Sequence, residues 1–138
     1  MIKVHIDCLK GKSLDWALVE AMHGKTERVD DGWQVYDIRG GYIGMIPLGD
    51  APVENGKLFE VQDNPAMCWT LACACRIQLI PVGEDAWLLK LDELDVICKD
   101  YDEIPDKMAK MVIKNFLCRG WIEIPAELVD IPCEHQET

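Results

Sequence analysis

The chain has 138 residues, 49% of them hydrophobic, so it can bury one core, and we expect one domain spanning residues 1–138. Its 14 basic and 25 acidic residues give a net charge of −11, which disfavours direct binding to the phosphates of DNA or RNA. No run approaches the ~20 apolar residues of a membrane span, and the N-terminus lacks the pattern of a signal peptide. We therefore expect a cytoplasmic protein without membrane association.

The chain contains seven cysteines, and an odd number without an export signal argues against a disulfide framework. We therefore expect reduced thiols. Cys68, Cys73 and Cys75 are close in sequence, but structural zinc sites favour Cys-x-x-Cys pairs. Cys133 and His135 could complete a metal site only if the tail folds back. Buried thiols acting as small hydrophobic side chains are the better interpretation, so no metal or other cofactor is predicted.

The first elements follow from the spacing of apolar residues. Alternation from Ile2 to Ile6 predicts a short strand. From Leu14 to Met22 the apolar residues recur at helical spacing. Ser13 is a suitable N-cap and Gly24 a stop signal, so this segment predicts an amphipathic helix.

Residues 26–61 have the sequence pattern of a β-sheet. Turn sequences such as Asp31-Gly32 separate short runs rich in β-branched and aromatic residues. These runs predict antiparallel strands over residues 33–38, 42–46 and 57–61. Pro47 and Pro52 are expected to bracket a loop, because proline is out of place inside a central strand.

The second half begins with a helix start at Asn64 and Pro65, which predicts a short buried helix over residues 66–75, although the apolar run also fits a strand. Two apolar runs, residues 76–80 and 86–91, are separated by a turn sequence and predict a hairpin. A short strand is predicted over residues 121–124.

The strongest helix prediction covers residues 105–120, with Pro105 at its first position and Gly120 as the left-handed residue after its end. One face is apolar and comprises Met108, Ala109, Val112, Ile113, Phe116 and Leu117. The other face carries Lys107, Lys110 and Lys114. Because most strand connections are too short for parallel crossovers, we predict an α+β fold: a small antiparallel sheet with two amphipathic helices on one face and a possible third short helix.

Both ends of the chain resemble a known family. Residues 9–17, Leu-Lys-Gly-Lys-Ser-Leu-Asp-Trp-Ala, resemble the Leu-x-Gly-x-x-Leu-Asp-Trp-Ala opening of the phage NinX-like family. The helix ending at Leu117, then Gly120 and the Ile122-Glu123-Ile124-Pro125 run with Glu127 and Leu128, resembles that family's ending. The resemblance implies an accessory protein of tailed phages, acting in the cytosol of an infected bacterium. It supplies no catalytic residues, because the function of the family is not established.

The residues of the matching opening have two interpretations. Asp15 can interact with the N-terminal amides of its helix while Trp16 closes the core, or both can belong to a recognition surface. Arg39 precedes two glycines that could form an anion-binding turn, although a hairpin turn explains them as well. The sequence contains no Walker motif, dinucleotide fingerprint or Gly-x-Ser-x-Gly.

We therefore expect a non-enzymatic protein that binds a host or phage protein stoichiometrically, and that could inhibit a host defence protein. The predicted acidic, tryptophan-bearing surface includes Asp92, Glu93 and Asp95, and tryptophan is enriched at binding hot spots.

Two alternative functions stay open. The sequence also leaves the oligomeric state open, and a homo-oligomer is one of the possibilities. The first alternative is a binder of a nucleotide-like signal, using Arg39 or Arg76 for phosphate and Trp33 or Trp69 for stacking. The second is a small enzyme that uses a cysteine or a bound metal.

Overall fold

The computed structural model describes residues 1–49, 58–61 and 64–129. Short 3₁₀ helices are labelled η. The elements are β1 (Ile2–His5), η1 (Ile6–Cys8), α1 (Lys12–Ala21), β2 (Lys25–Val29), β3 (Gly32–Tyr36), β4 (Tyr42–Pro47), α2 (Pro65–Cys75), β5 (Gln78–Pro81), β6 (Trp87–Leu91), β7 (Leu94–Cys98), η3 (Tyr101–Glu103), α3 (Ile104–Leu117), β8 (Trp121–Ile124) and η4 (Ala126–Leu128).

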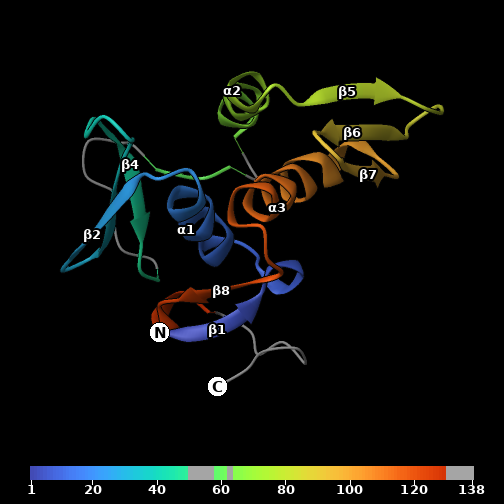
Figure 1. The fold of residues 1–138 in the computed structure, drawn as a ribbon. Coiled ribbons are helices and arrows are strands. Elements are labelled where there is room, and N and C mark those ends of the chain that lie inside the picture. Colours follow the sequence, from blue (N-terminus) through green and yellow to red (C-terminus); the bar gives the residue numbers. More distant parts are fainter. Residues whose placement is uncertain (50–57, 62–63, 130–138) are drawn as a thin grey trace.

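Helices α1 and α3 pack against each other at the centre of the molecule (Figure 1). Leu14 and Leu18 of α1 share one core with Val112 and Ile113 of α3, and all four are buried. Burying a side chain of this size contributes about 1.5–3 kcal/mol. Both amphipathic helices predicted from the sequence are therefore confirmed, and their apolar faces meet each other.

The described strands form three small antiparallel sheets around this helix pair (Figure 1). β1 pairs with β8, with Ile2 opposite Ile124, so segments far apart in sequence lie side by side. The second sheet has the order β2-β3-β4 and the third β5-β6-β7. The predicted α+β class is confirmed, while the strands are divided among separate sheets because each hairpin pairs with its own neighbours.

Helix α2 confirms the third predicted helix, but the expectation that it is buried is wrong, because Trp69, Thr70, Cys73 and Ala74 are exposed. The Asn64 side chain accepts a hydrogen bond from the backbone N–H of Met67 at 3.2 Å, which caps the first turn. Arg76 follows the helix in the left-handed conformation, with φ of 57°, and ends it.

Three details of the helix predictions are wrong. α1 begins at Lys12 after Gly11, and Ser13 lies inside the first turn, where its hydroxyl donates to the Lys10 carbonyl at 2.8 Å. The left-handed residue after α3 is Cys118, not Gly120. Phe116 is 43% exposed, because the last turn of α3 extends beyond the core that covers its earlier turns.

The strand predictions also needed tertiary information. Within the described part of residues 57–61 the structure has an isolated parallel bridge between Leu58 and Met45 in place of a strand. Gly44 permits this close approach: it has φ of 152°, and a Cβ there would lie 3.1 Å from the Phe59 backbone nitrogen.

The strands β2 and β7 were not predicted from the sequence. Pro47 ends β4 and Pro52 lies outside the described residues.

The cysteines differ from the prediction at one position. Cys8 is disulfide-bonded, so the expectation that all the thiols are reduced is wrong there. The free cysteines are Cys68, Cys73, Cys75, Cys98 and Cys118.

Within the described residues, no helix has the length and apolarity needed to cross a bilayer.

Candidate functional site

The sheet β5-β6-β7 has one face on the core and one face turned away from it. Leu89 is fully buried and Leu91 nearly so, and both belong to the inner face that packs on α3. Because side chains alternate along a strand, their neighbours Leu88 and Lys90 lie on the outer face. The strand register therefore determines which residues meet on that outer face.

Two cross-strand rows lie on the outer face. Ile80 of β5 is opposite Leu88 of β6, which is opposite Ile97 of β7, so three apolar residues form one row. Ile80 is 37% exposed and Ile97 59% exposed. The neighbouring row consists of Gln78, Lys90 and Asp95. Leu88, between Ile80 and Ile97, is half-buried, so the outer face combines a partly exposed apolar row with a polar row.

Acidic residues lie at both ends of this sheet. Residues 84–106 contain nine carboxylates against two lysines, Lys90 and Lys99. The carboxylates are Glu84, Asp85, Asp92, Glu93, Asp95, Asp100, Asp102, Glu103 and Asp106. Glu84 and Asp85 lie in the β5–β6 connection, at one end of the sheet, and Asp92 and Glu93 form the β6–β7 turn at the other end. We call the outer face with these two turns the acidic sheet face.

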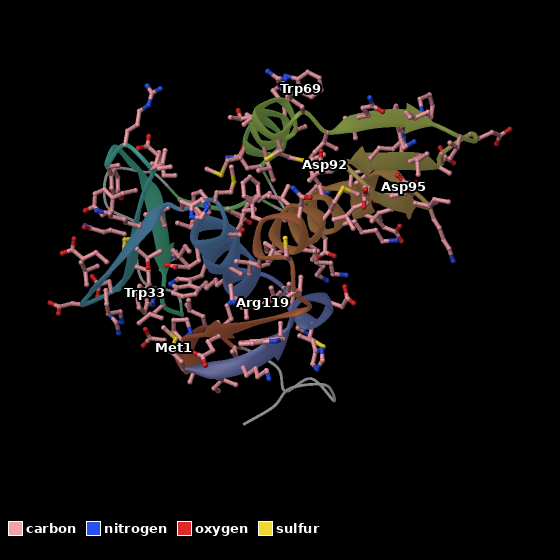
Figure 2. The ribbon with its side chains drawn as sticks, viewed as in Figure 1. Met1, Trp33, Trp69, Asp92, Asp95 and Arg119 are labelled. Atoms are coloured by element: carbon pink, nitrogen blue, oxygen red, sulfur yellow. The ribbon has the colours of Figure 1, made fainter. Side chains whose placement is uncertain are left out.

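The predicted acidic residues lie together in the structure. Figure 2 shows Asp92 and Asp95 on the β6–β7 hairpin beside α3. Asp92, Glu93 and Asp95 are all exposed, and the structure gives their side chains no ion pair within the residues it describes. Asp92 has φ of 52°, a left-handed conformation that aspartate tolerates better than most residues. Their charges therefore remain available to a partner.

The two residues of the matching opening lie in the core. Asp15 is 4% exposed, and its carboxylate accepts a hydrogen bond from the backbone N–H of Val61 at 3.1 Å. Trp16 is 5% exposed and contacts Trp33 edge to face, with ring centroids 5.9 Å apart. Trp16 therefore closes the core as that interpretation expected, whereas the bond from Asp15 to Val61 was not predicted. Both side chains are buried, so neither lies on a recognition surface.

Trp33 connects the second sheet to the end of the described chain. Its indole N–H donates to Glu127 at 2.8 Å, and Arg28 forms an ion pair with the same carboxylate at 2.7 Å. The hydrogen bond from Arg28 lowers the pKa of Glu127, and the indole hydrogen bond acts in the same direction. These contacts hold the β2–β3 hairpin against η4.

The four residues of the nucleotide-binding alternative lie on two parts of the molecule, Trp33 and Arg39 on the β2-β3-β4 sheet and its turn, Trp69 and Arg76 on α2 and directly after it. Trp33 and Trp69 lie on opposite sides of the molecule in Figure 2, and Trp69 is 64% exposed on α2. Arg39 is exposed in the β3–β4 turn, where the Asp37 carboxylate accepts its backbone N–H. Arg76 is exposed after α2. The best-formed pockets lined by described residues contain none of these four side chains.

Three of the free thiols, Cys68, Cys75 and Cys98, are wholly or partly buried, whereas Cys73 and Cys118 are exposed. Burial raises the pKa of Cys68, Cys75 and Cys98, which disfavours the nucleophilic thiolate. Cys68 lies 3.8 Å from the sulfur of Met108. In the part of the chain that the structure describes, no three His, Cys, Asp or Glu side chains form a cluster that could hold a metal ion.

The lysines of α3 are engaged by nearby acceptors. Lys107 pairs with Glu103 at 3.2 Å and Lys110 with Asp106 at 3.0 Å. Lys114 pairs with Asp7 at 2.6 Å, a contact that lowers the pKa of this aspartate. The lysine face predicted from the sequence is therefore a row of neutralised charges.

Comparisons of the chain with protein-family models, curated proteins and solved structures found no match.

The sequence located the carboxylates of the acidic sheet face but not its apolar row. Ile80 and Leu88 belong to the predicted hairpin, whereas Ile97 belongs to β7, which was not predicted. The alternation from Leu94 to Cys98 was the available signal.

Proposed function

We propose that this protein is a non-enzymatic phage accessory protein that acts by binding another protein stoichiometrically through the acidic sheet face. The observation that carries the proposal is the row of Ile80, Leu88 and Ile97 between two acidic turns, in which Ile80 and Ile97 are exposed and Leu88 is half-buried. Protein interfaces combine an apolar centre with a polar rim, and this face has both parts.

The charge of the face indicates the chemistry of the partner. The acidic sheet face carries five carboxylates against one lysine, Lys90, which favours a basic surface that also exposes apolar side chains. The five are Glu84, Asp85, Asp92, Glu93 and Asp95. The carboxylates would attract such a partner over a distance, and the apolar row would supply the contact that excludes water. A basic groove on a host protein, including a defence protein that binds nucleic acid, has this chemistry.

Two observations favour binding over catalysis. The pKa of each of the thiols Cys68, Cys75 and Cys98 is raised by burial, and Asp15 has its hydrogen bond in the core. The phage origin rests on the resemblance of residues 9–17 and of the C-terminal segment, and it implies that the partner and this protein meet in the bacterial cytosol.

The proposal is tested by capturing proteins from a bacterial host lysate with purified protein and identifying them by mass spectrometry. The decisive variant is Glu93→Lys with Asp95→Lys, which reverses two charges of the face. Asp92 is left unchanged, because a lysine at its positive φ would add backbone strain to the change in charge. We expect the partner captured by the wild type to be lost.

The matched control reverses two exposed acidic charges elsewhere, Glu27→Lys with Asp30→Lys at the β2–β3 hairpin. This variant should capture the partner as well as the wild type does. Ile97→Ser should weaken capture without changing the net charge, and raising the salt concentration should weaken it further. If both double variants behave alike, or if no captured protein distinguishes them, the acidic sheet face is not the binding surface.

A further inference from the structure

A pocket opens between α1, the β3–β4 hairpin and α2, and it shares no described residue with the acidic sheet face. Its volume is about 330 Å³, within the size range of small-molecule sites. Its floor consists of buried apolar side chains, Leu18, Val19, Phe59, Val61 and Leu71. Its rim includes the exposed residues Ile38, Ile43, Thr70 and Ala74, so the pocket is open to solvent.

The hydroxyl groups in the wall are already bonded within the protein. The Tyr36 hydroxyl donates to the Gln34 side-chain oxygen at 2.8 Å. The Thr70 hydroxyl donates to the Ala66 carbonyl at 2.9 Å. A ligand rich in polar groups would therefore lose its own hydration without full replacement, which favours a ligand with an apolar body.

Asp37 is the only charged residue in the described lining of the pocket. One of its carboxylate oxygens accepts the backbone N–H groups of Arg39 at 2.9 Å and Gly41 at 2.8 Å. These bonds fix the carboxylate at the start of the turn, and its second oxygen, Oδ2, has no hydrogen bond from the described residues. A fixed carboxylate beside an apolar pocket attracts a cation and repels an anion, and the net charge of −11 acts in the same direction.

We propose that this pocket binds a small amphiphilic cation, an amine with an aliphatic or aromatic body, whose apolar part lies on the buried floor and whose ammonium group pairs with Asp37. The site is independent of the protein-binding function proposed above, because the two surfaces share no described residue. Anionic ligands such as nucleotides and fatty acids are the wrong class for it.

The probes are octylammonium, octanol and octanoate, used below their micelle-forming concentrations and compared by isothermal titration calorimetry with the full chain at neutral pH. They share a chain length and differ in charge. We expect octylammonium to bind roughly fivefold more tightly than octanol, the size of effect that a partly exposed ion pair gives, and octanoate to bind most weakly.

Two variants separate the charge from the cavity. Asp37→Asn keeps an acceptor for the two backbone N–H groups of the turn and should lower the affinity for octylammonium to that of octanol. Ala74→Trp fills the pocket from an exposed position of α2 and should remove binding of all the probes. Cys73→Trp, at an exposed position of the same helix outside the described lining, is the matched control and should bind like the wild type.

Several results would overturn the proposal. They are the absence of saturable binding by the wild type, equal or tighter binding of octanol or octanoate, and an Asp37→Asn variant that keeps the preference for octylammonium. Light scattering tests one further result that would overturn it. If the wild type is a dimer and Ala74→Trp is a monomer, a second copy of the chain occupies the pocket. Circular dichroism of each variant confirms that it is folded before its affinity is interpreted.

Discussion

The carboxylate of Asp15 in α1 accepts the backbone N–H of Val61 at 3.1 Å, and both residues are buried. This bond joins the first helix to a segment that precedes α2, 46 residues later in the chain. The acidic residue of the motif that resembles the phage family therefore ties α1 to Val61, a residue that lies outside the strands of the described chain.

Replacing Asp15 should destabilise the protein. The size of the loss should depend on whether the new side chain can still accept the hydrogen bond from the Val61 N–H. Asp15→Leu leaves a buried N–H without its acceptor and should lower the free energy of unfolding by about 1–3 kcal/mol. Asp15→Asn keeps a carbonyl oxygen and should cost less. Urea denaturation followed by circular dichroism measures both. Equal losses in the two variants would show that the hydrogen bond to Val61 is not what Asp15 contributes.

Two apolar residues of α3 should respond differently to truncation. Ile113 is fully buried, so Ile113→Ala should cost about 2–5 kcal/mol through lost burial and the cavity left behind. Phe116 is 43% exposed and meets His23 edge to face, with ring centroids 6.3 Å apart, so Phe116→Ala should cost less than half as much. Chemical denaturation of the two variants compares them directly. A larger loss at Phe116 would contradict the burial seen in α3.

Glu127 gives the fold a pH-dependent contact. Because Arg28 lowers the pKa of the folded carboxyl, its contribution is present above the unfolded glutamate value of about 4.3 and is lost as the pH falls through the folded pKa. At this exposed position the contribution is at most about 1 kcal/mol. Glu127→Gln should therefore lower the urea midpoint at pH 7, and this difference should shrink as the pH falls below about 4.3.

The neighbouring Glu123 is the control for this experiment, since Glu123→Gln changes the same net charge at an exposed position of β8. Its urea midpoint should shift less than that of Glu127→Gln at pH 7. The indole N–H resonance of Trp33, assigned with a Trp33→Phe variant, should move as Glu127 is protonated. A resonance unaffected by this titration would mean that the 2.8 Å contact does not persist in solution.

Thiol reactivity should follow burial. Cys118 is exposed after α3, whereas Cys98 is fully buried and burial raises the pKa of its thiol. Brief alkylation of the folded protein at pH 8, read by tandem mass spectrometry, should modify Cys118 and Cys73 well before Cys98 and Cys68. In urea the four rates should converge. Early modification of Cys98 in the folded state would indicate that β7 separates readily from α3.

The sequence by itself determined the elements whose signals are local. The helical periodicity of residues 105–120, the Asn64 cap of α2 and the alternation around the turn at residues 83–85 each depend on neighbours within a few positions. Composition likewise determined the acidity of residues 84–106. These features gave the α+β class and the carboxylates of the acidic sheet face.

Only the tertiary structure decided how these elements meet. Phe116 has the same periodicity as Ile113, and contacts from distant segments bury one and not the other. The apolar row on the acidic sheet face exists because β7 pairs with β6 in one register, and Asp37 borders a pocket because α2 lies across from α1 and the β3–β4 hairpin. Local propensity carries no information about such contacts, because their free energy comes from residues that meet only in the folded chain.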